Sequence, residues 1–366
     1  MAKKKKKFSK GLTITVAVLI FLLGSVGGFI GYFRMNLPDD SDVYVSGELE
    51  GHFLELGNKY TGDCTYIRVG NTDILIDAGS KTASVPVIRE YLDEHMADDV
   101  LDYVIVTHAH EDHYAGFATP EGTDSLFDLY ECDTIIDFSQ ITSGKESQKM
   151  YQNYVRERDA EIAAGATHYT AKECMEQGKN KFDLGSGVEL EILDSYFYYQ
   201  TSDTENNHSV CVMIHQGDEH YLFTGDLEKE GEEKRGEMND LPQVSLYKAG
   251  HHGSKTSSNE VLLSVIRPEI VCVCCCCGSP EYSTVSASQF PTQAFVDRIA
   301  PYTDRVYVTT LCVDYEAGKV TSMNGNIVIR STKDGIEVRC SGSDKVLRES
   351  DWFEKNRNCP EAWKKK

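Results

Sequence analysis

The segment 107–113 holds the residues best suited to chemistry in this chain. It reads Thr-His-Ala-His-Glu-Asp-His and follows the apolar run 103–106 directly. Imidazole and carboxylate together suit zinc, manganese or iron, and packing alone does not require such a mixture. We therefore predict a metal site here rather than a histidine-rich surface turn. The candidate ligands in this segment are His108, His110, Asp112 and His113.

Three other segments of the chain end in the same way, with an apolar run followed by a potential ligand. Asp77 follows the run 74–76, Asp226 follows 221–225, and the pair His251-His252 follows 244–250. A single aspartate after a strand is usually a turn former. Several ligands at several strand ends, however, are what a rigid metal site at a sheet edge requires. We predict that these side chains meet in space.

The elements that must position these ligands alternate between short strands and amphipathic helices. Strands are expected at 54–56, 66–69 and 73–77, and a helix begins near Ser84 and Pro86. A long helix is expected over 145–163, and hairpins over 210–224 and 325–339. This pattern predicts an α/β fold in which two packed sheets carry helices on their outer faces.

Twelve cysteines raise the question of disulfides or a zinc cluster, because five of them fall within residues 272–277. That segment is bounded by Pro268 and Gly278 and is typical of a buried strand, in which cysteine acts as a small hydrophobic residue. Adjacent strand residues point to opposite faces, so these cysteines could not all converge on one metal. The pairing of Cys340 with Cys359 is left open.

The N-terminal segment predicts a membrane anchor. Residues 1–34 carry seven basic residues and no acidic one, and 23 uncharged residues separate Lys10 from Arg34. At about 1.5 Å per residue, such a helix crosses a hydrocarbon core of about 30 Å. The lysines should remain cytoplasmic, so the rest of the chain should lie outside. A cleaved signal peptide is the alternative, although no Ala-x-Ala site follows the apolar stretch.

This reading divides the chain into five parts. We expect a basic cytoplasmic tail at 1–10, a transmembrane anchor at 11–33, a linker at 34–46, a domain that carries the predicted metal ligands at 47–342 and a C-terminal tail at 343–366. The part after residue 34 holds 30 of the 37 basic residues and all 58 acidic ones, a net charge of −28. Such a charge repels long polyanions. No segment indicates a protein partner.

With these motifs, the chain resembles the metallo-β-lactamase superfamily, and in particular the extracytoplasmic hydrolase domain of ComEC-type competence proteins. The segments that carry the resemblance are 62–64, 76–79, 108–113, 206–209, 224–226 and 250–254. The resemblance spans roughly residues 50–330 and implies an αββα sandwich with a metal site at one edge. A competence channel has many membrane spans, whereas this chain has one predicted span.

The resemblance implies two divalent metal ions, zinc or else manganese. His108 and His110 should bind the first metal, with His208 as a candidate third ligand. Asp112 and His113 should bind the second, with Asp226 bridging both. One of His251 and His252 should complete the second site, and sequence does not decide which. Asp77 is expected to orient ligands, and Lys248 and Ser254 are candidates for contacting a substrate phosphate.

Two metals about 3.5–4 Å apart, with hydroxide held between them, suit phosphodiester hydrolysis. We therefore expect a membrane-anchored, extracytoplasmic metal-dependent phosphodiesterase or nuclease, with Asp112, Asp226 and Lys248 in catalytic roles. Its substrate should be a short nucleic acid or an envelope polymer. The alternatives are a phosphorylcholine-type esterase, a lactam hydrolase, and a non-catalytic surface module with a structural metal.

Overall fold

The computed structural model describes residues 49–332 and 335–364. The predicted cytoplasmic tail (1–10), membrane anchor (11–33) and linker (34–46) lie outside the described residues. Within the described ranges, no helix combines the length and the apolar character that crossing a membrane requires. Residues Ser46–Lys366 form one compact unit.

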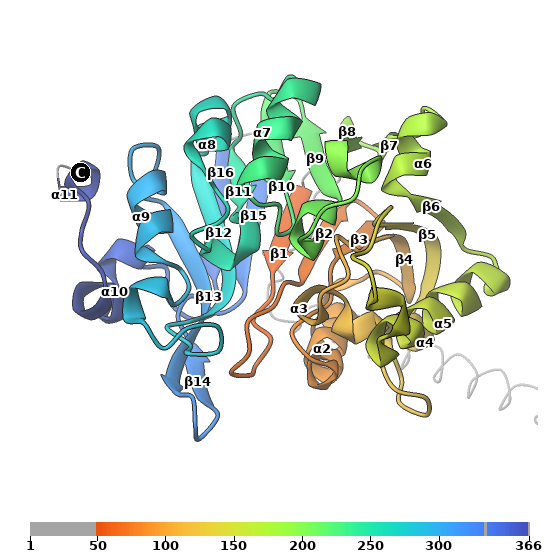
Figure 1. The fold of residues 1–366 in the computed structure, drawn as a ribbon, viewed down its shortest axis with the longest axis horizontal. Helices are drawn as coiled ribbons and strands as arrows, with labels where there is room; N and C mark the ends of the chain where they lie inside the picture. Colours follow the sequence, from red (N-terminus) through yellow and green to blue (C-terminus); the bar gives the residue numbers. More distant parts are fainter. Residues whose placement is uncertain (1–48, 333–334, 365–366) are drawn as a thin grey trace, which may run out of the picture. The chain divides into compact units, whose positions relative to one another are not determined.

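Two eight-stranded sheets form the centre of this unit (Figure 1). The first has the order β16-β15-β1-β2-β3-β4-β5-β6, with β1 Leu49–Phe53, β2 Thr65–Val69, β3 Thr72–Ile76, β4 Val100–Ile105, β5 Glu131–Asp137, β6 Thr167–Thr170, β15 Ile327–Thr332 and β16 Gly335–Cys340. The second has the order β14-β13-β12-β11-β10-β9-β8-β7, with β7 Lys181–Asp183, β8 Val188–Leu193, β9 Cys211–Gln216, β10 Glu219–Phe223, β11 Leu246–Lys248, β12 Ile270–Cys277, β13 Val306–Asp314 and β14 Lys319–Ser322.

Helices cover the outer face of each sheet (Figure 1). The helices beside β3, β4 and β5 are α2 (Val85–His95), α4 (Leu126–Leu129) and α5 (Lys149–Ala164), and those beside β10 to β13 are α7 (Lys229–Met238), α8 (Glu260–Ile266) and α9 (Gln293–Ile299). The predicted α/β class with two packed sheets and outer helices is confirmed. Strands β3 to β6 are mutually parallel, as are β10 to β13. Their carboxyl ends therefore meet at one edge of each sheet.

The apolar core explains why the chain folds this way. Phe53 of the first sheet stacks on Phe223 of the second, with ring centroids 6.2 Å apart. All eight residues of β12 are buried, as the predicted cysteine-rich strand requires. Cys272 and Cys274 belong to the core that includes residues of both sheets, whereas Cys275 and Cys277 pack with residues of α8 and α9. The described cysteines are free thiols, including Cys340 and Cys359.

Three expectations about the elements were wrong. No strand forms at 54–56, since β1 ends at Phe53 and these residues have no regular secondary structure. The helix predicted over 145–163 is interrupted: Lys145–Ser147 is an isolated 3-10 turn, and α5 begins only at Lys149. Gln148 separates the turn from α5, because its extended backbone does not continue a helix. Gly144, with φ of 87°, lies just before the turn.

The predicted C-terminal tail at 343–366 is part of the domain instead. It contains the helices α10 (Asp351–Asn356) and α11 (Glu361–Lys364). Trp363 is buried in the apolar cluster that also contains Cys275 and Cys277, and its indole nitrogen donates to the carbonyl of Thr303 at 2.9 Å.

Candidate metal centre

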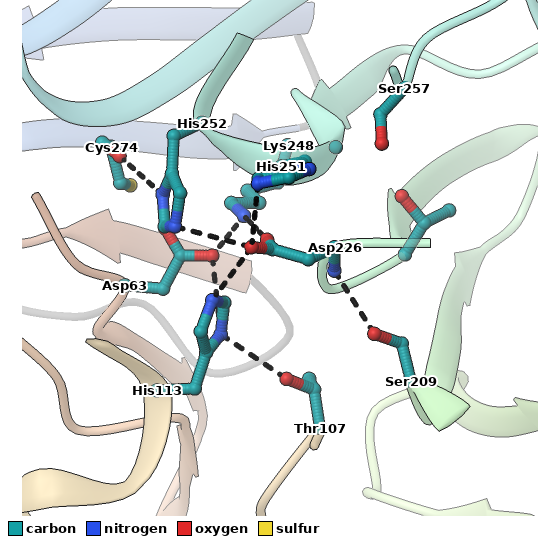
Figure 2. Close-up of polar contacts among 12 residues, drawn as sticks. Asp63, Thr107, His113, Ser209, Asp226, Lys248, His251, His252, Ser257 and Cys274 are labelled. Carbon is teal, nitrogen blue, oxygen red and sulfur yellow. Dashed lines mark hydrogen bonds and ion pairs between the residues drawn. The ribbon is translucent and has the colours of Figure 1, made fainter. Parts of the chain in front are cut away.

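Four buried side chains converge where the two sheets meet, at the edge that holds the carboxyl ends of their parallel strands (Figure 2). They are Asp63, His113, Asp226 and His252, and one ligand atom of each lies within 4.8 Å of the others. Asp63 precedes β2 and His113 follows β4, in the first sheet, whereas Asp226 follows β10 and His252 follows β11 in the second. Segments 189 residues apart along the sequence thus supply one cluster.

A carboxylate behind His113 fixes the orientation of its ring. The Nδ1 atom of His113 donates to Asp77 at 2.7 Å, and Thr107 donates to the same carboxylate through its amide and its hydroxyl. The Nε2 atom of His113 is thereby directed at Asp226, 3.1 Å away. Asp77 itself has a φ of 58°, a strained value for a residue with a side chain. The placement agrees with the orienting role expected for Asp77.

Gly79 allows the loops of the centre to approach each other closely. A side chain there would overlap the backbone of Asp112, since a Cβ would lie 1.7 Å from its carbonyl oxygen. Instead, the Gly79 amide donates to the carbonyl of Asp63, and the Asp63 amide donates to that of Asp112. Gly79 is thus required for the close packing of these loops.

The sequence left open which of the adjacent His251 and His252 is a metal ligand, and the structure distinguishes them. His252 is fully buried, and its Nδ1 atom donates to the carbonyl of Cys274 at 2.9 Å. Its Nε2 atom consequently faces Asp226 at 3.3 Å and Asp112 at 3.4 Å. His251 lies at the edge of the cluster, with Nε2 3.9 Å from Asp226 and Nδ1 bonded to Thr256 at 3.0 Å. His252 is therefore the better placed candidate ligand.

We expect the two histidines to respond differently to substitution. His252→Ala should lower zinc affinity by about a hundredfold or more, because it removes a buried donor from the cluster, whereas His251→Ala should change the affinity by less than about tenfold. Competition with a chromogenic chelator measures both values. Equal losses in the two variants would contradict the assignment.

Lys248 and Asp63 form a buried ion pair behind Asp226. The Lys248 ammonium contacts the Asp63 carboxylate and lies 3.9 Å from Asp226 Oδ1 (Figure 2). Lys248 is only 3% exposed, so its charge is directed at the carboxylates of the centre. This geometry orients Asp63 and Asp226, and it leaves a substrate phosphate without access to the ammonium.

The other residues of the histidine segment lie beside the cluster. His108 Nε2 is 3.0 Å from His110 Nδ1, and the rings of His108 and His113 have centroids 4.1 Å apart. The Ser209 hydroxyl lies 3.4 Å from His108 Nδ1 and accepts a hydrogen bond from the amide of Asp226. Ser209 therefore links His108 to the cluster. Asp112 accepts a hydrogen bond of 2.8 Å from the hydroxyl of Tyr282.

His208 is placed differently from the other candidates. Its Nε2 atom accepts the amide of Ser202 at 3.2 Å, and Nδ1 lies 3.6 Å from Glu205. Both ring nitrogens therefore face its own loop, and the neighbouring Ser209 is the residue of this segment that contacts His108. The chain thus presents the Ser209 hydroxyl to His108 Nδ1 where an imidazole of His208 was expected.

The carboxylates and imidazoles of the cluster perturb one another strongly. Burial lowers the pKa of His113, but Asp226 and Asp77 outweigh burial and raise it to about 10. Burial likewise opposes the charge of His252, and Asp226 and Asp63 hold its pKa well above the usual value. Burial raises the pKa of Asp226, whereas His113 and His252 lower it well below its usual range. Without a metal, the protons on His113 and His252 balance the negative charge of the carboxylates around them.

The donor set fits a metal ion. Four atoms of the cluster are buried without a hydrogen-bond partner: Asp63 Oδ1, His113 Nε2, Asp226 Oδ1 and His252 Nε2. Buried polar atoms without partners are rare and call for an explanation such as a bound ion. Two imidazoles and two carboxylates are a donor set that zinc and manganese accept.

Asp63 is the member of the cluster that sequence reasoning did not select as a ligand. It lies in the segment 62–64, which supported the resemblance, but no histidine is adjacent to it. Its position directly before a strand, after a glycine, was the available signal.

Parts of this chain are similar to known proteins. Residues 57–119 and 199–277 match the family model of the metallo-beta-lactamase superfamily. Competence protein ComA of Neisseria gonorrhoeae is 26% identical over 315 residues, which cover 82% of this chain and 37% of that protein. ComE operon protein 3 of Bacillus subtilis is 33% identical over 101 residues, which cover 26% and 13%. Recombination protein 2 of Haemophilus influenzae is 26% identical over 153 residues, which cover 42% and 16%.

The chain therefore has the metallo-β-lactamase fold and is similar to ComEC-type competence proteins. It spans between 13% and 37% of the length of these three relatives. The metallo-beta-lactamase fold protein YhfI of Bacillus subtilis is 11% identical, with a TM-score of 0.40, and the match covers 75% of this chain and 99% of that one.

A pocket of about 280 Å³ opens beside the candidate centre. Its lining is rich in hydroxyl groups and includes one lysine: His251, Ser254, Lys255, Tyr282, Ser283, Ser288, Phe290 and Thr292. Because it includes His251 and Tyr282, the pocket is continuous with residues that contact Asp226 and Asp112.

Proposed function

We propose that this chain is a metal-dependent phosphodiester hydrolase that acts outside the cytoplasm and is anchored by residues 11–33. The observation that carries the proposal is the cluster of Asp63, His113, Asp226 and His252, whose buried atoms lack hydrogen-bond partners. In this proposal, His108, His110 and Asp112 hold a second divalent ion beside the first.

A bound divalent ion would acidify a water molecule and neutralise charge that develops on a phosphate oxygen. The chain's own residues prepare that site. Asp77 holds His113 in one ring orientation, and Lys248 stabilises the ionised form of Asp63 beside Asp226. The hydroxyl-rich pocket beside His251 offers donors to the oxygens of an anionic ester.

The substrate class rests on two further observations. Two of the relatives bear the words competence or recombination in their names, which favours a nucleic-acid phosphodiester. The net charge of −28 beyond residue 34 opposes long duplex DNA, because a polyanion is repelled unless basic residues neutralise it. Short single strands or an envelope polymer are therefore the better candidates.

A substrate panel tests this proposal. The full chain, loaded with zinc or manganese, is assayed with bis(p-nitrophenyl) phosphate, a short single-stranded DNA, a teichoic polymer and a chromogenic lactam. Metal-dependent cleavage of one or more phosphodiesters, lost on chelation, is the expected result. Cleavage of the lactam alone would overturn the phosphodiester assignment.

A non-catalytic module with a structural metal is the second candidate. Four ligands that close around one buried point are typical of structural zinc sites, and His113 and His252 are fully buried. Metal binding with no turnover on any ester of the panel would favour this alternative. A phosphorylcholine-type esterase would instead cleave the choline-bearing polymer and leave DNA intact.

A further inference from the structure

Lys145 is a buried cation without a counterion. The described ranges 49–332 and 335–364 bury two lysines, Lys145 at 8% exposure and Lys248 at 3%. Lys248 is ion-paired with Asp63. The Lys145 ammonium, in contrast, makes no ion pair or side-chain hydrogen bond with any residue of those ranges. Most of the Lys145 side chain is buried, but its ammonium is not one of the fully buried side-chain atoms of those ranges that lack a hydrogen-bond partner, so a ligand can reach it.

The surroundings place Lys145 at the candidate metal centre. Its charge acts on Asp112 and Glu205, and it lowers the pKa of His110 in addition to the larger effect of burial. Its loop is joined to the segment before β9, because Thr142 donates to Glu205 through its amide at 2.9 Å and its hydroxyl at 2.7 Å. The next residue, Asn206, contacts His251 at 3.4 Å. Lys145 therefore lies near His110 and Asp112 of the segment 107–113.

The neighbouring carboxylates are already engaged. One oxygen of Glu205 accepts both hydrogen bonds from Thr142, and the other faces His208 at 3.6 Å. Asp112 accepts from Tyr282 and faces His252. Neither approaches Lys145 within ion-pair distance, so the positive charge of Lys145 is available to a ligand.

The break before α5 produces this arrangement. In a continuous helix from residue 145, Lys145 would occupy the first turn, close to exposed Lys149. The left-handed Gly144 and the extended Gln148 instead set Lys145–Ser147 apart as a separate turn. Of residues 143–149, only Lys145 is buried.

We propose that Lys145 binds the anionic phosphate group of the substrate beside the His108–His110 pair, and so selects anionic phosphodiesters over neutral esters. The inference rests on the proposed function and names the group that recognises its substrate. An ammonium binds a phosphate oxygen as a point charge with three donors. The bound phosphate supplies the counterion that the chain itself does not provide.

The test compares Lys145→Met with the matched variant Lys149→Met, which removes an exposed lysine four residues away. Both are made in the full chain and checked for thermal unfolding and metal content. Affinity for inorganic phosphate is measured by calorimetry. Hydrolysis of bis(p-nitrophenyl) phosphate is compared with that of the neutral ester p-nitrophenyl acetate. A hydrogen bond to a charged group contributes about 1.5–3 kcal/mol, which corresponds to roughly a tenfold to hundredfold change in affinity.

Lys145→Met is expected to weaken phosphate binding about tenfold or more and to raise KM for the anionic ester. Hydrolysis of the neutral ester and the metal content should not change in Lys145→Met, and the Lys149→Met protein should bind phosphate as the unaltered chain does. Phosphate binding of unaltered strength in a folded, metal-loaded Lys145→Met protein would overturn the inference while the proposed function stood. If the chain cleaves no phosphodiester but still binds phosphate through Lys145, the inference stands and the proposed function fails.

Discussion

Asp226→Asn is expected to abolish function more completely than any other single substitution in this chain. The carboxylate is buried and lies 3.1 Å from His113 and 3.3 Å from His252. Asparagine keeps the shape but removes the charge that holds a cation and both imidazoles together. We expect the loss of at least one bound metal and a fall in hydrolysis on the order of 10³-fold, about 4 kcal/mol in transition-state stabilisation. Metal analysis and steady-state kinetics measure both effects.

The matched control for this substitution is Asp218→Asn. Asp218 is an exposed aspartate in the turn between β9 and β10, eight residues before Asp226. It should retain full metal content and activity. A folded Asp226→Asn protein with normal metal content would disprove the assignment of Asp226 to the centre.

The metal-free protein is expected to lose stability as the pH rises, and the metal-loaded protein is not. Burial opposes the charge on His113, but Asp226 and Asp77 raise its pKa from 6.5 to about 10 in the folded state. The stabilisation from this proton is thus fully present below pH 6.5 and is lost as the pH rises toward 10. The pKa of His252 is also raised, so loss of its proton lowers stability in the same direction. We expect the melting temperature of the metal-free protein to fall by about 5 °C or more between pH 6.5 and roughly pH 9.

A bound metal replaces these protons, so metal affinity should rise over the same range as His113 and His252 release them. Calorimetric melting of the metal-free and metal-loaded proteins side by side isolates the contribution of the cluster. His113→Gln should flatten the pH dependence of the metal-free protein. If the melting temperatures of the metal-free and metal-loaded proteins changed with pH in parallel, His113 and His252 would not titrate as expected.

The fold and much of the centre could be predicted because the relevant signals are local. Apolar runs that end in ligands indicated strands whose carboxyl ends share an edge, and the structure brings His113, Asp226 and His252 together there. The buried cysteine strand followed from its apolar composition and its bounds. The choice between His251 and His252 could not be predicted, because it depends on the carbonyl of Cys274, which lies 22 residues beyond His252.

Other features depend on tertiary contacts that leave little trace in the sequence. Asp63 belongs to the cluster because Lys248, 185 residues away, pairs with it across the two sheets. His208 follows a promising motif, yet its ring is held by Ser202 in its own loop. The isolation of Lys145 arises from backbone conformations at Gly144 and Gln148 that helical periodicity does not report.

Three contacts within the centre cross from one sheet to the other: His113 with Asp226, His252 with Asp63, and Lys248 with Asp63. Neither half of the chain can therefore assemble the centre alone. A cation bound there would join the two halves of the molecule, and it could be captured only after they have docked. Occupancy of the centre would then report on correct folding as well as on readiness for catalysis.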